Sequence, residues 1–379
     1  MSKLSKSKSL KPTSPTHYNV LIIPDAYVNN FVCVFIKDFM LQLKKRGWHI
    51  VSDAIKKTGN IAKDLSKLTG IAREPDILCF YVFREREFKS WKGKMMALKK
   101  TLKVLVTEDV NAQEDIDPIK DSLQWFDVIF SRYPKPVKHH LGSIKIPVYR
   151  LSHGATSSFS IPLNFDKKKN VMLLSGAIDE DVYPIRRQAY DFMKSGYKYI
   201  EQRKHPGYNK LKRSAEQEAH NYATNINQYK LALADVPILN HGYPYLIAKH
   251  FEFMAANTAV ITNKIAIPYL KDHGLHEGKH YIAIDSKNMK STIEHWLKPE
   301  NQNKLKKITA AGNKVVLNKH MTEHRLTEFD RHVKELFRKK VGNRKSKTKR
   351  NSKSKRRSKT KKINRKSKTK AKSKNKSKK

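Results

Sequence analysis

Short apolar runs alternate with amphipathic stretches along most of the chain, and this alternation restricts the possible folds more than any other feature. Each run in the first half has the length of one strand buried on both faces. Residues 31–45 have helical spacing, and Gly47 ends that segment. Strands that alternate with helices predict βαβ units around a parallel sheet. The five predicted strands are Asn19–Ile23, Trp48–Val51, Asp76–Val82, Leu102–Val106 and Phe126–Phe130.

A second series of the same kind begins near Asn170. Its predicted strands are Asn170–Gly176, Tyr229–Ala234, Thr258–Thr262 and Tyr281–Ile284, and its predicted helices are Lys290–Leu297, Glu300–Leu317 and Thr322–Lys339. Two series joined near residues 145–165 predict an α/β protein with two Rossmann-like domains facing a cleft. We expect these domains to cover residues 18–147 and 148–337, with a basic tail at each end.

The two tails carry much of the formal net charge of +45. Residues 338–379 contain 24 Lys or Arg and no acidic residue, and residues 1–17 are Lys/Ser-rich. Such segments lack the apolar residues of a core, so both tails are predicted to be disordered. Lys/Arg arrays bind polyanions through counterion release, which makes nucleic acid, an anionic membrane or an acidic glycan a candidate partner. A solvated tail with no defined partner is the alternative.

The composition also indicates a compartment. Cys33 and Cys79 lie in apolar runs, as buried free thiols do in a reducing compartment. No segment has the run of roughly 18 apolar residues that a membrane span needs, and the N-terminus lacks the apolar core of a signal peptide. We therefore expect an intracellular, cytoplasmic protein without a transmembrane segment, and the basic tail offers a route to nuclear or virion association.

Four blocks, in order along the chain, carry a resemblance to a known family. They are Leu151–Phe159 (LSHGATSSF), Leu174–Gly176 with Tyr183–Arg187 (LSG…YPIRR), Lys249–Thr262 (KHFEFMAANTAVIT) and His320–Arg325 (HMTEHR). Together they resemble the two-domain glycosyltransferases of the GT-B fold, of the group-1 type that includes the spore-coat maturation proteins. The resemblance implies transfer of a sugar from a nucleotide-diphosphate-sugar donor to an acceptor. Two positions depart from the family pattern: Pro244 stands where many relatives have a second Glu, and Asn257 where Gly is common.

The resemblance places the donor in the second domain. It implies donor-binding roles for Glu252, Lys249, Arg186, Arg187, His153, Gly154 and Gly176. Cationic side chains and helix N-termini can stabilise the charge on a departing diphosphate, so no cofactor and no obligatory metal is expected. A buried carboxylate such as Glu252 is satisfied by two vicinal ribose hydroxyls. The alternatives are solvated helix charges for the arginines, an ion pair between Lys249 and Glu252, an exposed Glu252 on an amphipathic helix, and a structural turn between the domains at His153 and Gly154.

Acidic residues follow two predicted strands of the first domain. Asp25 comes after the first strand, and Glu108 and Asp109 after the fourth, at the edge where open α/β sheets bind ligands. Each is a candidate base for an acceptor hydroxyl, and capping or turn formation is the alternative. Residues 179–181 (DED) contain a D-x-D pattern but precede a predicted helix, where acidic residues cap, so no metal site is predicted.

The sequence leaves two possible functions, which belong to different classes of protein. The first is a glycosyltransferase with an unknown acceptor. The second is a non-catalytic polyanion-binding or virion-type structural protein that keeps a degenerate glycosyltransferase fold. The ordered blocks favour the enzyme, whereas the Lys-rich tail and Pro244 favour the structural protein.

Overall fold

The computed structural model describes residues 17–23, 34–52, 61–82, 95, 98–107, 123–143, 145–162, 164–203, 214–238 and 244–342. The expected helix start at residues 31–33, Cys33, and nearly all of both predicted tails lie outside these ranges. The chain divides into two compact units, residues 1–330 and residues 331–379, and the two domains described below belong to the first of these units.

The first domain is built on a six-stranded parallel sheet with the order β2-β1-β3-β4-β5-β6. Its strands are β1 (Asn19–Ile23), β2 (His49–Ser52), β3 (Ile77–Val82), β4 (Leu102–Thr107), β5 (Val128–Ser131) and β6 (Val148–Arg150), and its helices are α2 (Val34–Lys45), α3 (Ile61–Thr69) and α6 (Pro134–Leu141). All five strands predicted for this half are confirmed. The sequence analysis missed β6, which has only three residues.

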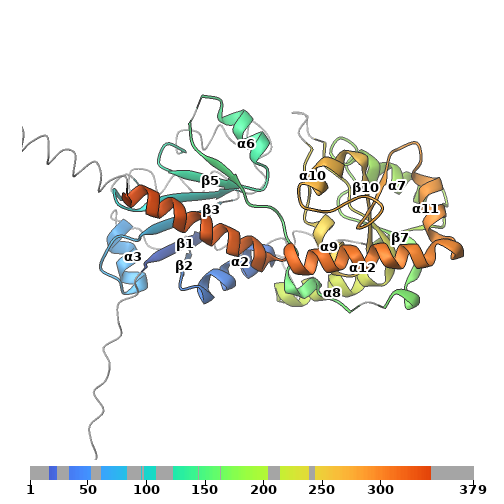
Figure 1. Ribbon diagram of the computed structural model, residues 1–379, viewed down its shortest axis with the longest axis horizontal. Helices are drawn as coiled ribbons and strands as arrows, with labels where there is room; N and C mark the ends of the chain where they lie inside the picture. Colours follow the sequence, from blue (N-terminus) through green and yellow to red (C-terminus); the bar gives the residue numbers. More distant parts are fainter. Residues whose placement is uncertain are drawn as a thin grey trace, which may run out of the picture. The chain divides into compact units, whose positions relative to one another are not determined.

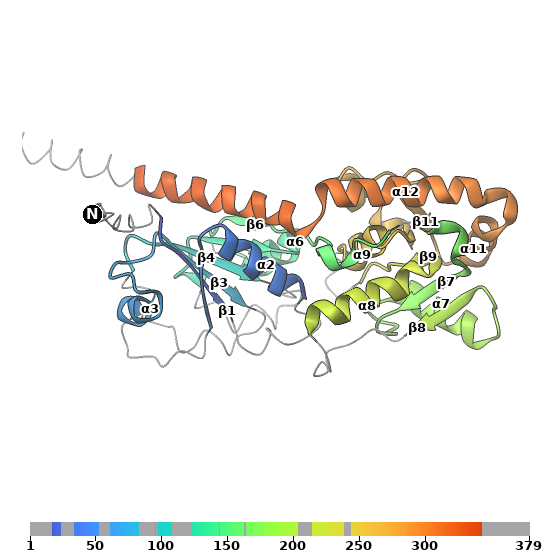
Figure 2. The same ribbon diagram turned by 90° about the horizontal axis from the view of Figure 1, so that it is seen from below.

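The second domain contains a five-stranded parallel sheet with the order β11-β10-β9-β7-β8. Its strands are β7 (Lys169–Ser175), β8 (Ile200–Arg203), β9 (Tyr229–Leu233), β10 (Ala259–Asn263) and β11 (Ile282–Ile284). Its helices are α7 (Pro184–Lys194), α8 (Ala215–Asn227), α9 (Lys249–Ala255), α10 (Ile267–Lys271), α11 (Met289–Leu297) and α12 (Gln302–Lys319). Two parallel sheets with flanking helices confirm the predicted α/β fold (Figures 1 and 2).

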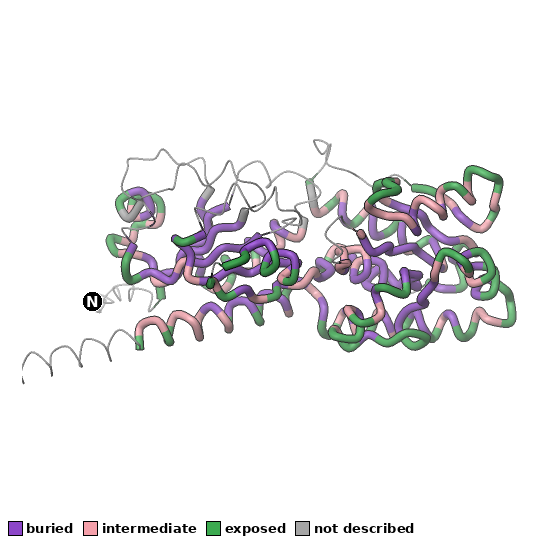
Figure 3. Tube along the Cα trace, turned by 90° about the horizontal axis from the view of Figure 1, so that it is seen from above, coloured by how far each residue is buried: buried purple, intermediate pink, exposed green. Residues whose placement is uncertain are grey.

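Both sheets have the strand order 2-1-3-4-5 at their core, with the first strand between the second and the third. In such open sheets, ligands bind beyond the carboxyl ends of the strands at the point where the strand order reverses. That point lies between β1 and β3 in the first domain and between β7 and β9 in the second. The strands are largely buried on both faces (Figure 3), as their continuous apolar sequences require.

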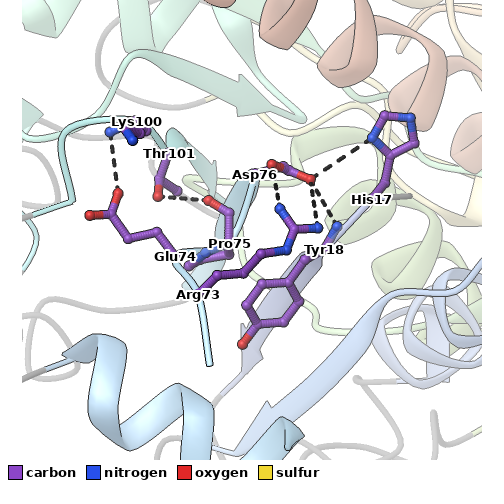
Figure 4. A network of polar contacts seen from close by, with 8 residues as sticks. All are labelled: His17, Tyr18, Arg73, Glu74, Pro75, Asp76, Lys100 and Thr101. Atoms are coloured by element: carbon purple, nitrogen blue, oxygen red, sulfur yellow. Dashed lines mark hydrogen bonds and ion pairs between the residues drawn. The ribbon is translucent and has the colours of Figure 1, made fainter. Parts of the chain in front are cut away.

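Polar contacts stabilise the end of the first sheet at which the strands begin, opposite their carboxyl ends (Figure 4). The Asp76 carboxylate accepts a hydrogen bond from the Tyr18 backbone N–H at 2.9 Å and pairs with Arg73 at 3.1 Å. The Thr101 hydroxyl donates to the Pro75 carbonyl at 2.7 Å. These bonds tie together the starts of β1, β3 and β4, far from the ligand-binding edge, so we assign them a structural role.

Candidate donor site

The loop between β7 and α7 supplies the glycine of the site. Gly176 has φ +111°, a backbone conformation that favours glycine. A Cβ at this position would lie 3.0 Å from Nη1 of the Arg186 guanidinium and 3.3 Å from Cε of Lys249. The absent side chain therefore lets two cationic side chains from different helices approach the same loop.

Arg186 is a buried cation with unused hydrogen-bond donors. The residue is 1% exposed, and its guanidinium carbon lies 3.8 Å from the centre of the Tyr183 ring. One terminal nitrogen donates to the Ala177 carbonyl at 3.0 Å, but Nε and the other terminal nitrogen have no hydrogen-bond partner among the described residues. Burial rules out the expected alternative of a solvated helix charge. Because an unsatisfied buried charge is costly, this guanidinium is suited to an anionic ligand.

Asp235 occupies the N-terminus of α7. It follows β9, is fully buried, and accepts the Arg186 backbone N–H at 2.8 Å. Burial raises the pKa of this carboxyl to about 6, although the Arg186 backbone and guanidinium lower it. The N-terminus of α7 is thus already capped by the protein, and the Arg186 side chain is the group of this helix that is suited to an anion. No local sequence pattern indicates this role of Asp235.

Lys249 and Glu252 lie on α9, one turn apart. Among the described residues no ion pair joins them within 4 Å, so the expected alternative of a simple ion pair is not supported. Burial lowers the pKa of Lys249, and the nearby Arg186 guanidinium lowers it further. Burial raises the pKa of Glu252, and the Lys249 ammonium opposes that rise. Two cations held close together beside one carboxylate are suited to bind an anion, with a hydrogen-bond acceptor beside it.

Arg187 takes no part in this cluster. Its Nε pairs with the Asp191 carboxylate at 3.0 Å, one turn along α7, and its side chain is 41% exposed. It is the solvated helix charge that the sequence analysis gave as the alternative. Its position beside Arg186 makes it a matched control for substitutions there.

These elements have counterparts in known proteins. Residues 182–331, which include α7, α9 and α12, match the family described as glycosyl transferase-like. An alpha-glucosyltransferase in complex with UDP superposes with a TM-score of 0.57 at 14% identity, over 82% of this chain and 98% of that chain. A glycosyltransferase from Rickettsia africae superposes with a TM-score of 0.52 at 13% identity, over 86% of this chain and 100% of that chain. No curated protein sequence matches.

The chain has the GT-B fold, and its second domain matches the glycosyl transferase-like family. The family match covers less than half of the chain, in its second domain, and the structural likeness extends the fold over both domains. The more specific resemblance to spore-coat maturation proteins stays an expectation. The described residues include no helix with the length and apolarity of a membrane span. They also include no group of three or more side chains suited to a metal ion.

Several predicted features of the chain have a structural explanation. Asn257 has φ +54°, which explains the glycine common at this position and is a conformation that Asn tolerates. Asp179 accepts hydrogen bonds from the backbone N–H groups of Asp181 and Val182 at 3.1 and 3.2 Å. It therefore caps a turn before α7 and not, as predicted, the helix itself, because the helix begins only at Pro184. The candidate bases Asp25, Glu108 and Asp109 lie outside the described residues.

Gly154 has a packing role in the segment that joins the two domains, which we call the hinge. A Cβ on Gly154 would lie 2.7 Å from the His320 carbonyl oxygen and 3.2 Å from the Met321 carbonyl carbon. The adjacent Ala155 donates its backbone N–H to the same His320 carbonyl at 3.0 Å. The hinge backbone therefore lies directly against the segment that follows α12, which supports the structural alternative for Gly154.

Gly154→Ala is expected to destabilise the protein by about 1–3 kcal/mol, because the added methyl group meets backbone atoms that cannot rotate away. Gly70→Ala is the control: Gly70 has φ +72°, but a methyl group there would have no atom within 4 Å. Its cost of about 1 kcal/mol is therefore backbone strain alone. Urea denaturation measures both values. Equal destabilisation by the two substitutions would contradict the packing role.

His153 lies at the same hinge. Its Nε2 is 2.8 Å from the Tyr133 hydroxyl, and its carbonyl accepts a hydrogen bond from Arg325 Nε at 3.0 Å. Burial and the neighbouring Arg132 guanidinium lower the pKa of His153 well below its usual value. The imidazole is therefore neutral at physiological pH. It can exchange hydrogen bonds with a bound sugar but does not contribute charge to a phosphate site.

Proposed function

We propose that this protein is a glycosyltransferase that moves a sugar from a nucleotide-diphosphate-sugar donor to an acceptor hydroxyl, with the donor held in the second domain. The observation that carries the proposal is the buried Arg186 guanidinium, which keeps free N–H groups beside Lys249 and the Gly176 loop. The donor diphosphate supplies acceptor oxygens for the guanidinium nitrogens of Arg186 that have no partner among the described residues. The loop follows β7, at the reversal of strand order where α/β sheets bind ligands.

Each side chain has a role in the proposed transfer. Arg186 and Lys249 bind the diphosphate and stabilise the negative charge that grows on the leaving oxygen. Glu252 accepts hydrogen bonds from the ribose hydroxyls. Because two cations already serve the leaving group, we propose that the reaction needs no obligatory metal and no cofactor. Asp25, Glu108 and Asp109 stay predictions for the base.

The ligands bound in similar structures indicate which nucleotides to test first for binding. One alpha-glucosyltransferase structure contains UDP-glucose and DNA with an abasic site; it superposes with a TM-score of 0.58 at 13% identity, over 83% of this chain and 98% of that chain. At this identity the likeness shows a shared fold only. We therefore choose UDP and UDP-glucose as the first probes, and GDP as the comparison.

The test is thermal unfolding of the full-length protein with each nucleotide. UDP at 100 times its dissociation constant is expected to stabilise the fold by about 2.7 kcal/mol, which raises Tm by several degrees. Glu252→Ala should remove most of this stabilisation, whereas Arg187→Ala, on the surface of α7, should leave it unchanged. If no nucleotide or nucleotide-sugar shifts Tm, and Glu252→Ala has no effect, the enzymatic proposal fails.

The second candidate function is polyanion binding by a protein with a degenerate glycosyltransferase fold, and the tail composition and Pro244 favour it. The two functions are compatible, because the Lys/Arg-rich segment after residue 338 binds polyanions independently of a folded site. We propose a cytoplasmic location for the enzyme, with nucleic acid or another polyanion as the partner of the tail.

A further inference from the structure

A pocket lies beside the segment that joins the two domains, and the proposed donor site does not account for it. Its apolar lining includes the rings of Tyr245, Phe251 and Tyr269. Its cationic lining includes Arg132, Lys135 and Arg150, and the lining residues that the structure describes include no carboxylate. A pocket with aromatic walls and cationic groups is suited to a ligand that joins a ring to an anionic group.

The aromatic wall of the pocket is firmly held. The Tyr133 and Tyr245 rings lie 3.9 Å apart between centroids, although they are 112 positions apart in sequence. The Tyr133 hydroxyl is hydrogen-bonded to His153, and its backbone N–H donates to the Ser131 hydroxyl at 3.0 Å. Because these side chains are already held in place, binding a sugar or base ring against them costs less conformational entropy.

Two of the three cations are available to a ligand. Lys135 is exposed at the start of α6; its ammonium lies 5.3 Å from the centre of the Tyr269 ring, and no carboxylate lies within 4 Å of it among the described residues. Arg150 reaches an oxygen of the exposed Asp272 at 3.7 Å, a distance at which solvent screens the attraction. Arg132 is structural, since it donates to the Ser152 carbonyl at 2.9 Å and to the Tyr81 hydroxyl at 3.1 Å.

The pocket shares a helix with the proposed donor site. Phe251 lines the pocket, and its neighbours in α9, Lys249 and Glu252, belong to the donor cluster. The two histidines of the lining, His153 and His273, both have pKa values lowered by burial and are neutral at physiological pH. The positive charge that a ligand meets in the pocket therefore comes from Lys135 and Arg150, with Arg132 behind them.

We propose that this pocket binds the acceptor, and that the acceptor carries a phosphate group next to a sugar or base ring. The inference rests on the proposed function. In the transfer, the acceptor hydroxyl oxygen forms a bond to the anomeric carbon. The bond from that carbon to the diphosphate oxygen breaks, its electron pair leaves with the nucleoside diphosphate, and the hydroxyl proton passes to a base.

The test measures binding of three probes to the full-length protein saturated with UDP: glucose 6-phosphate, glucose and the dinucleotide pTpT. Both phosphate compounds contain a ring and an anion, whereas glucose lacks the anion. We expect a phosphate compound to bind at least about tenfold more tightly than glucose, because hydrogen bonds to charged groups are stronger than neutral ones. Tighter binding of glucose 6-phosphate identifies a small sugar phosphate as the source, and tighter binding of pTpT identifies nucleic acid.

The decisive variant is Lys135→Glu, with Lys138→Glu as its matched control. Lys138 is exposed on the same helix but does not line the pocket. Lys135→Glu should weaken binding of the preferred phosphate compound at least about tenfold and leave UDP affinity unchanged. Equal loss in the two variants, or glucose binding as tightly as the phosphate compounds, would overturn the proposal. Failure of UDP to bind the unmodified protein would instead count against the donor site.

Discussion

Arg186→Met lowers the affinity for UDP by about 100-fold or more, which is the largest effect that we expect from a single substitution. Two guanidinium nitrogens of Arg186 have no hydrogen-bond partner among the described residues and can donate to phosphate oxygens. A hydrogen bond to a charged group contributes about 1.5–3 kcal/mol, so the loss of two such bonds exceeds a factor of about 100. Titration calorimetry with UDP measures the change, and Arg187→Met should bind UDP like the unmodified protein.

The same substitution should hardly alter the stability of the ligand-free protein. Met fills much of the volume of Arg and removes the cost of burying nitrogens that lack partners. This gain offsets the loss of the bond to the Ala177 carbonyl and of the attraction to Asp235. We expect a free energy of unfolding within about 1 kcal/mol of the original, measured by urea denaturation. A large loss of stability together with unchanged UDP affinity would show that Arg186 is a structural residue.

Glu252→Gln is expected to have the second largest effect, a loss of about 10- to 100-fold in UDP affinity. The ionised carboxylate accepts hydrogen bonds from two ribose hydroxyls, whereas the amide has a single, uncharged oxygen acceptor. A nucleotide that lacks the 2′-hydroxyl separates the two cases, because it should bind the original protein more weakly than UDP and the variant almost as well as UDP. Equal discrimination by both proteins would remove Glu252 from the ribose site.

The pH dependence of UDP binding follows from the same groups. Binding requires Glu252 to be ionised and Lys249 to be protonated. Burial raises the pKa of Glu252, so affinity should fall as the pH drops below a value higher than the usual carboxyl range. Burial and Arg186 lower the pKa of Lys249, so affinity should also fall as the pH rises above a value lower than the usual lysine range. Titration calorimetry across the pH range measures both limbs. Glu252→Gln should abolish the acidic limb and, because the Glu252 carboxylate raises the pKa of Lys249, should move the basic limb to lower pH.

The sequence predicts most of the sheet because its central strands are continuous apolar runs. Asn19–Ile23 is predicted with the bounds that the structure gives it, and nine strands in all are confirmed. The two missed strands, β6 and β8, lie at sheet edges. The sequence of β8 is IEQR, of which only Ile200 is buried, so it lacks the apolar signal of a buried strand.

The sequence predicts only some of the residues of the proposed donor site. Motif spacing identifies Lys249, Glu252 and Arg186, because each lies in a continuous block of sequence. Asp235 has no such signal, since its function depends on a hydrogen bond to a backbone N–H 49 positions away. The pairing of Tyr133 with Tyr245 is equally invisible to local pattern, because tertiary folding brings the two rings together.

A crystal structure of the protein with UDP would show directly whether the Arg186 cluster is the donor site. We expect a diphosphate oxygen within hydrogen-bond distance of Arg186 Nε or its unpaired terminal nitrogen, with Lys249 beside the same group. We also expect the ribose hydroxyls on the Glu252 carboxylate. UDP bound away from the Gly176 loop, with the Arg186 nitrogens still unpaired, would refute the proposed donor site.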